Sequence, residues 1–117
     1  MKYFFILLVS FVFVYPASAK TEKGQKTWSG FIIDKMCAKR KAASVEKMKA
    51  HTKTCLLEES CSSTGYGVVV GKKWIPFDKK GNEIAENYIK NSSKTNDFEV
   101  EVTGKMKGNK IAVTAIQ

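Results

Sequence analysis

Two runs of alternating apolar and polar residues close the chain, and they constrain its fold more than any other feature. The apolar positions of the first run are Phe98, Val100 and Val102, and those of the second run are Ile111, Val113 and Ala115. Alternation with a period of two predicts strands that bury one face. The segment Lys107-Gly108-Asn109-Lys110 between the runs predicts a hairpin connection.

Three further strands and two helices are predicted before this hairpin. The strands are expected at residues 27–34, 66–70 and 74–77, and the helices at about residues 44–56 and 82–91. Without the first helix, the order is three strands, one helix and two strands, which is the order of an OB-fold. The sequence therefore predicts a mainly β domain over residues 27–117. It would be an OB-like, five-stranded, partly open barrel with a helical insert between strands one and two.

The first 19 residues have the composition of a cleaved signal peptide. Lys2 supplies a positive charge, residues 4–15 are almost entirely apolar, and Ala17-Ser18-Ala19 fits the small-residue cleavage pattern. The apolar run is short for a membrane span. We therefore expect an exported protein, periplasmic or extracellular, whose mature chain starts at Lys20 with a flexible polar leader over residues 20–26.

The chain is strongly basic, with a formal net charge of +9. Nearly all of its basic residues are lysines, and Arg40 is the only arginine. Proteins that bind nucleic acid commonly use arginine forks as well as bulk charge, so a nucleic-acid partner is disfavoured. We expect a monomer with a solvated lysine surface that makes at most weak contact with an anionic membrane or wall polymer.

The insert between the first two strands carries the residues that are suited to metal or thiol chemistry. They are the three cysteines, Cys37, Cys55 and Cys61, and the only histidine, His51. On the predicted helix, His51 and Cys55 stand four residues apart and project from one face. Cys37 and Cys61 from the flanking loops would complete a Cys3His zinc site, and nearby lysines would favour the thiolate forms. Met36 and Met48 make copper a second candidate metal.

A different interpretation of the insert needs no metal. In an exported protein, Cys61 would form a structural disulfide with Cys55 or Cys37, and the third cysteine would stay buried as a thiol. A thiol-redox enzyme or redox sensor that uses the unpaired cysteine is the alternative function. His51 and Asp34 could then be set beside a cysteine as base and orienting group, but the sequence does not show that they meet. Asp34 is expected to end the first strand by accepting hydrogen bonds from the following loop.

The chain resembles a family of small exported bacterial proteins that have an OB-like barrel and no assigned activity. The resemblance rests on four motifs: W-x-G-x-[IV]-x-D-x-x-C at residues 28–37, A-H-T-x-x-C at 50–55, S-x-G-Y-G at 63–67 and V-x-G-x-x-x-G-x-x-[IL]-x-V at 102–113, with Cys61 between the second and the third. The resemblance implies the barrel fold and an envelope location, and it carries no catalytic residues. We expect a non-catalytic binding or structural module whose ligand, a metal ion or an unidentified small molecule or envelope component, is held by the Cys37–Cys61 insert.

Overall fold

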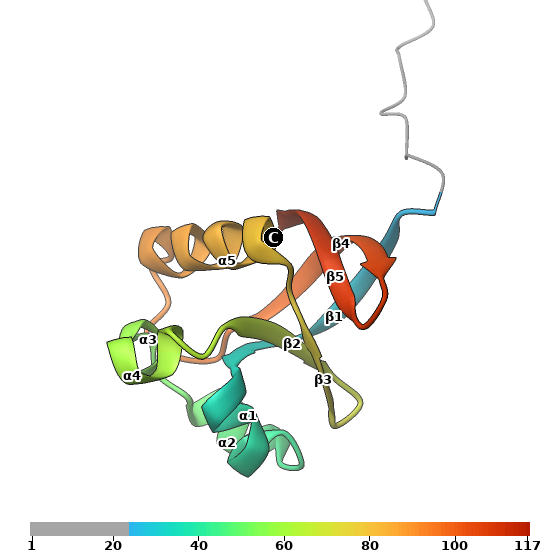
Figure 1. Ribbon diagram of the computed structural model, residues 1–117. Coiled ribbons are helices and arrows are strands. Elements are labelled where there is room, and N and C mark those ends of the chain that lie inside the picture. The colour runs from blue at the N-terminus through green and yellow to red at the C-terminus, as the bar shows by residue number, and fades with distance from the viewer. Residues whose placement is uncertain (1–23) are drawn as a thin grey trace, which may run out of the picture.

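The computed structural model describes residues 24–117, so the predicted signal peptide and residues 20–23 of the predicted leader lie outside the described residues. The elements in chain order are β1 (Lys26–Asp34), α1 (Lys35–Lys41), α2 (Val45–Ala50), α3 (Lys53–Leu57), α4 (Glu59–Ser62), β2 (Tyr66–Val70), β3 (Lys73–Pro76), α5 (Lys79–Asn91), β4 (Glu99–Lys107) and β5 (Lys110–Ile116). Figure 1 shows their arrangement. None of the helices in residues 24–117 combines the length and the apolar character that a membrane span requires.

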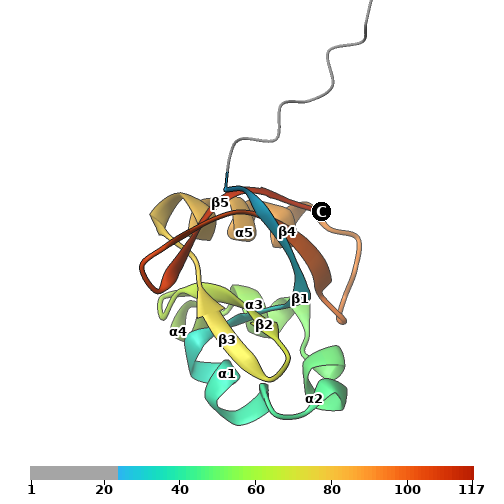
Figure 2. The ribbon, with the colours of Figure 1, turned by 90° about the vertical axis from the view of Figure 1, so that its right-hand side faces the viewer.

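The five strands form one antiparallel sheet in the order β3-β2-β1-β4-β5. The sheet is not closed by a continuous ladder, but an isolated parallel bridge between Phe77 and Ile111 brings its two edges together. Helix α5 lies between β3 and β4 in the chain, as predicted, and packs chiefly on β5. The protein is strand-rich with several helices, and its curled sheet is compatible with a partly open barrel (Figure 2).

The alternation predicted for the last two strands is confirmed except at its final position. Val100, Val102, Ile111 and Val113 are buried in one core. Ala115 is exposed, because a β-bulge near Thr103 and Gly104 adds a residue to β5 and reverses the alternation beyond it. Ile116 packs against the core in its place.

Strands β1 and β2 are covered on both faces, and this positions the site. Ile32 and Val68 belong to the main core, which α3 and α5 help to fill. Their neighbours Phe31, Ile33 and Val69 face a second core, which also contains Cys37, Ala38, Met48 and Cys61 of the insert. The last five residues of β1 are therefore buried without alternation. Helices α1 and α2, which cover the second core, lie on the opposite side of the molecule from α5 (Figures 1 and 2).

The helix predicted over residues 44–56 is interrupted. Ser44 caps α2 as expected, but α2 ends at Ala50, and α3 starts only after two extended residues, His51 and Thr52. The Thr52 hydroxyl accepts a hydrogen bond from the backbone N–H of Cys55 and so starts a new helix. His51 and Cys55 therefore do not share one helical face, and the geometric reason for pairing them as ligands is lost.

Candidate functional site

Asp34 is a fully buried carboxylate at the junction of β1 and α1. Its Oδ2 accepts a hydrogen bond of 2.9 Å from the backbone N–H of Cys37, which makes Asp34 the N-cap of α1. This confirms the prediction that Asp34 ends the first strand by binding the chain that follows. The other oxygen, Oδ1, is also buried and finds no hydrogen-bond partner among residues 24–117.

His51 lies beside that second oxygen, and its side chain is only 3% exposed. Its Nε2 is 3.5 Å from Asp34 Oδ1, and its Nδ1 is 2.8 Å from Nζ of Lys41. Since a lysine ammonium only donates, Nδ1 accepts and the imidazole proton sits on Nε2, facing Asp34. A separation of 3.5 Å is long for a hydrogen bond, so we treat the contact as an electrostatic attraction. Within the described chain, Nε2 has no hydrogen-bond partner either.

One buried thiol belongs to this cluster, and a second lies beside the first. Asp34, Cys37 and His51 each offer one ligand atom, and the three atoms lie within 4.8 Å of one another. The sulfur of Cys37 is 3.9 Å from that of Cys61, and both cysteines are free thiols. The end of β1, α1, the end of α2 and α4 thus bring a carboxylate, an imidazole and two thiols together in the second core.

The electrostatics of the cluster differ from the expectation that lysines activate the thiols. Burial and, after it, the negative charge of Asp34 raise the pKa of Cys37 to about 12. Burial raises the pKa of Asp34, but the attraction of His51 and the hydrogen bond from the Cys37 backbone outweigh burial, so the net shift of this pKa is downward. At neutral pH the cluster therefore contains a carboxylate beside a protonated thiol. A neutral thiol is a poor nucleophile, which argues against catalysis by Cys37.

The structure gathers three of the four residues predicted as ligands. Cys37 and Cys61 are adjacent, and His51 joins Cys37 through the shared cluster with Asp34. Cys61 lies outside the group of three mutually close ligand atoms and joins it only through Cys37, whereas Cys55 is half-buried on α3 and lies outside that group as well. Of the two methionines considered for copper, Met48 packs in the second core and Met36 is exposed.

The sequence predicted Asp34 as a hydrogen-bond acceptor that ends the first strand or as the orienting group of a thiol site, but not as a metal ligand, and it indicated no role for Lys41. The sequence does contain the spacing Asp-x-x-Cys at residues 34–37. With this spacing, the carboxylate of an N-cap aspartate lies close to the cysteine in the first turn of the helix. The contact between Lys41 and His51 spans ten residues and an interrupted helix, so no local pattern indicates it.

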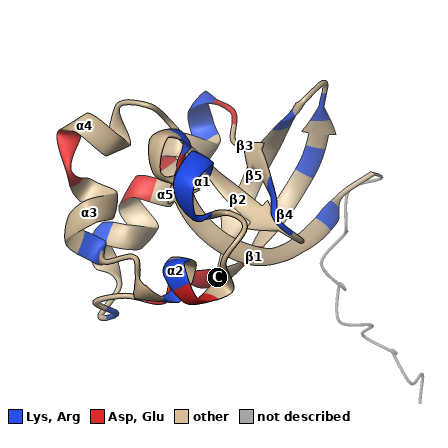
Figure 3. Cartoon of the chain, turned by 90° about the horizontal axis from the view of Figure 1, so that it is seen from below, with Lys and Arg blue, Asp and Glu red and all other residues tan. Residues whose placement is uncertain are grey.

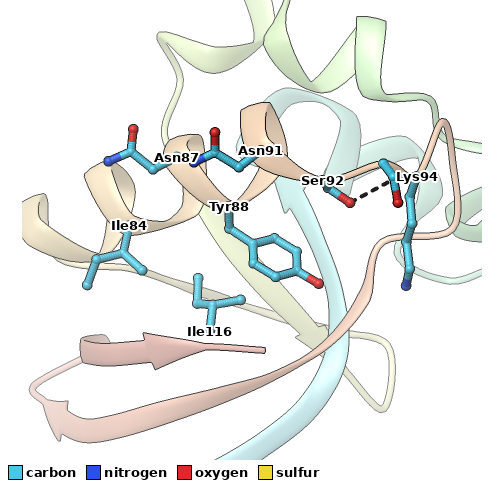
Figure 4. A pocket seen from close by; sticks show the side chains of 8 residues that line it. Ile84, Asn87, Tyr88, Asn91, Ser92, Lys94 and Ile116 are labelled. Carbon is cyan, nitrogen blue, oxygen red and sulfur yellow. Dashed lines mark hydrogen bonds between the residues drawn. The ribbon is translucent and has the colours of Figure 1, made fainter.

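A separate pocket of about 600 Å³ lies between α5 and the end of β5. Figure 4 shows Ile84 and Ile116 near Tyr88, with Asn87 and Asn91 along the helix. The residues that line it include no cysteine, histidine or carboxylate. This pocket is therefore unrelated to the buried cluster.

No family model, curated protein or solved structure matches the chain. The chemistry of the site must therefore be inferred from its own geometry. That geometry contains both a potential set of metal ligands and a pair of adjacent thiols.

Proposed function

We propose that this protein is a binding module for a transition-metal ion, held by Asp34, Cys37, His51 and Cys61. The observation that carries the proposal is the buried pair of Asp34 Oδ1 and His51 Nε2, which have no hydrogen-bond partner in the described chain and lie beside two buried thiols. Buried polar atoms are normally satisfied, and a metal ion satisfies all four groups at once.

Two distances between the proposed ligand atoms match those of a tetrahedral site. With zinc–sulfur bonds of about 2.3 Å, two thiolates in a tetrahedron stand about 3.8 Å apart. The sulfur atoms of Cys37 and Cys61 are 3.9 Å apart. With zinc–nitrogen and zinc–oxygen bonds of about 2.05 Å, the corresponding separation is about 3.4 Å. Asp34 Oδ1 and His51 Nε2 are 3.5 Å apart.

The charges also fit a divalent ion. One carboxylate and two thiolates around a dication leave a net charge of one negative unit, which the neighbouring Lys41 offsets. Binding through Nε2 moves the imidazole proton to Nδ1, so Lys41 no longer donates there. The mixed set of one oxygen, one nitrogen and two sulfur ligands suits zinc better than copper(I), which prefers sulfur throughout.

The test is metal binding by the reduced, full-length mature protein and by single variants. Wild type should bind about one zinc per chain, measured by elemental analysis after gel filtration. His51→Ala and Asp34→Asn should each weaken zinc binding at least about tenfold in competition with a chromophoric chelator, since each removes or neutralises a ligand.

Cys55→Ser is the matched control, because it removes a cysteine outside the cluster. It should bind zinc like wild type, and X-ray absorption of the zinc complex should show two sulfur ligands. Three sulfur ligands and loss of binding in Cys55→Ser would restore the Cys3His set. A wild-type protein that binds no metal under reducing conditions would overturn the proposal.

A second candidate function, a thiol-disulfide module, rests on the adjacency of Cys37 and Cys61. These two thiols need approach by only about 1.9 Å to reach bonding distance, which is about 2.05 Å for a disulfide. Under this hypothesis, protein purified from the cell envelope without reductant would be lighter by two hydrogens and would keep Cys55 as its one free thiol. This mass measurement therefore distinguishes a thiol-disulfide module from a metal-binding module.

We also propose that the sheet is a partly open barrel of the OB type and that the protein works in the bacterial envelope. The strand order, the Phe77–Ile111 bridge and the position of α5 between β3 and β4 support the OB assignment. The envelope location rests on the composition of residues 1–19 and on the resemblance to small exported barrel proteins. The intact mass of the protein recovered from the exported fraction tests this location. We expect that mass to match a chain whose first residue is Lys20.

A further inference from the structure

We propose that a second, separate site on this protein binds an anionic polysaccharide. The site is a basic face formed by five exposed lysines around Trp74: Lys35, Lys39, Lys72, Lys73 and Lys110. None of the proposed metal ligands belongs to it. The face spans α1, the β2–β3 turn with β3, and the start of β5.

Four open cavities hollow this face, with volumes between about 340 and 450 Å³. They are contiguous, because Trp74 lines three of them and Lys35 lines three. No aspartate or glutamate among residues 24–117 lines any of the four. Figure 3 shows the basic residues of α1 toward the viewer and others along the β4–β5 hairpin, whereas acidic residues mark α4 at the far left. A concave surface of one charge sign attracts and concentrates an oppositely charged partner.

Trp74 gives the centre of the face a rigid ring. Its Nε1 donates a hydrogen bond of 3.0 Å to the backbone oxygen of Ile33. The ring edge packs over Gly67, where a Cβ atom would come within 2.6 Å of the indole. The indole is half-buried and cannot rotate freely, so it presents a preformed apolar surface among the lysines.

A ring flanked by separated ammonium groups matches a chain of sugar rings that carry carboxylate or sulfate groups. The apolar face of a sugar can pack on the indole, and the lysines can neutralise charges on neighbouring sugars. Nucleic acid fits this face less well, because nucleic-acid sites commonly use arginine and several stacked aromatic side chains. Arg40 lines none of the four cavities, and Trp74 is the one aromatic side chain that lines more than one of them. A bilayer surface is flat and does not enter cavities.

The test measures binding of the full-length mature protein to polygalacturonate and to dextran sulfate, with neutral dextran as the blank. Wild type should bind both charged polymers and not the neutral one, equally well with zinc and with chelator. Lys35→Glu/Lys72→Glu should weaken binding at least about tenfold and reduce its salt dependence. Trp74→Phe should weaken binding to polygalacturonate severalfold while circular dichroism reports an intact fold.

Lys47→Glu/Lys49→Glu is the matched control, because it makes the same change of net charge on α2, where neither lysine lines these cavities. It should retain binding within about twofold. Equal loss in both double variants would show bulk charge attraction and overturn the site. Tighter binding to an oligothymidylate or to phosphatidylglycerol vesicles than to either polysaccharide, at matched salt, would overturn the choice of partner.

Discussion

The sulfur atoms of Cys37 and Cys61 lie 3.9 Å apart in the second core, although 24 residues separate them in the chain. This separation is the distance between two ligands of one tetrahedral ion, and it is also the distance from which a disulfide can form after a small movement. Cys37 is held by the N-cap at Asp34, and Cys61 by the short helix α4. The fold therefore makes these two cysteines a pair, whichever chemistry uses them.

We expect the three thiols to differ sharply in reactivity in the reduced, metal-free protein. Cys55 is half-buried, whereas Cys37 and Cys61 are buried. An aromatic disulfide reagent should therefore modify one thiol quickly and two slowly, and Cys55→Ser should abolish the fast phase. Zinc should slow the second phase further, and it should leave the fast phase unchanged. Protection of all three thiols by zinc would instead indicate that Cys55 is a ligand.

Metal binding should stabilise the folded protein. A ligand that binds only the native state at 100 times its dissociation constant adds about 2.7 kcal/mol to the free energy of unfolding. For a domain of this size, we expect zinc to raise the midpoint of thermal unfolding by about 10 to 20 °C. Differential scanning fluorimetry with and without a chelator measures this shift. His51→Ala should show little of it, and a full shift in that variant would remove His51 from the ligand set.

The strands were predictable from the sequence because their signals are local. The alternation in β4 and β5 and the apolar run at Tyr66–Val70 each reflect burial of one or both faces of a strand. The bulge that exposes Ala115 was not predictable, since it depends on how β5 aligns with β4. Helix α5 starts at Lys79, earlier than the predicted residue 82, because the Asp78 side chain caps it by accepting a hydrogen bond from the Gly81 N–H.

The site was predictable in composition but not in geometry. The apolar spacing between Val45 and Leu56 is compatible with one helix, but the Thr52 cap and tertiary hydrogen bonds interrupt it. The backbone N–H of Lys53 donates to the oxygen of Thr95, and Thr52 pairs with Asn96, so a distant loop holds the chain extended at His51. That break turns His51 toward Asp34, a carboxylate that the sequence predicted to end the first strand or to orient His51 beside a cysteine.

Tyr66 should titrate late and should make stability fall at high pH. Burial, followed by the negative charges of Glu86 and Asp34, raises its pKa to about 12. The unfolded chain ionises near its ordinary pKa of about 10, so the neutral phenol favours the folded state. This contribution is fully present below about pH 10 and is lost as the pH rises toward 12, by about 2 to 3 kcal/mol in all.

The measurement is phenolate absorbance against pH, together with urea unfolding at a series of alkaline pH values. Tyr66→Phe should remove the late absorbance step and flatten the loss of stability above about pH 10. That variant also loses the hydrogen bond from the phenol to the backbone oxygen of Leu56, so it should start from a lower stability at neutral pH. A late step that persists in Tyr66→Phe would show that another group is responsible.

The main core offers a test of the strand register that is independent of the proposed metal site. Val102 is fully buried, whereas its neighbour Glu101 is exposed on the other face of β4. Val102→Asp places an unpaired carboxylate in the core, at a cost of about 4 kcal/mol or more, which a domain of this size cannot tolerate. We expect that variant to lose its cooperative thermal transition and its dispersed NMR spectrum. Glu101→Lys, matched in position, should change the free energy of unfolding by less than about 0.5 kcal/mol. Equal tolerance of the two substitutions would show that the side chains of β4 face the other way.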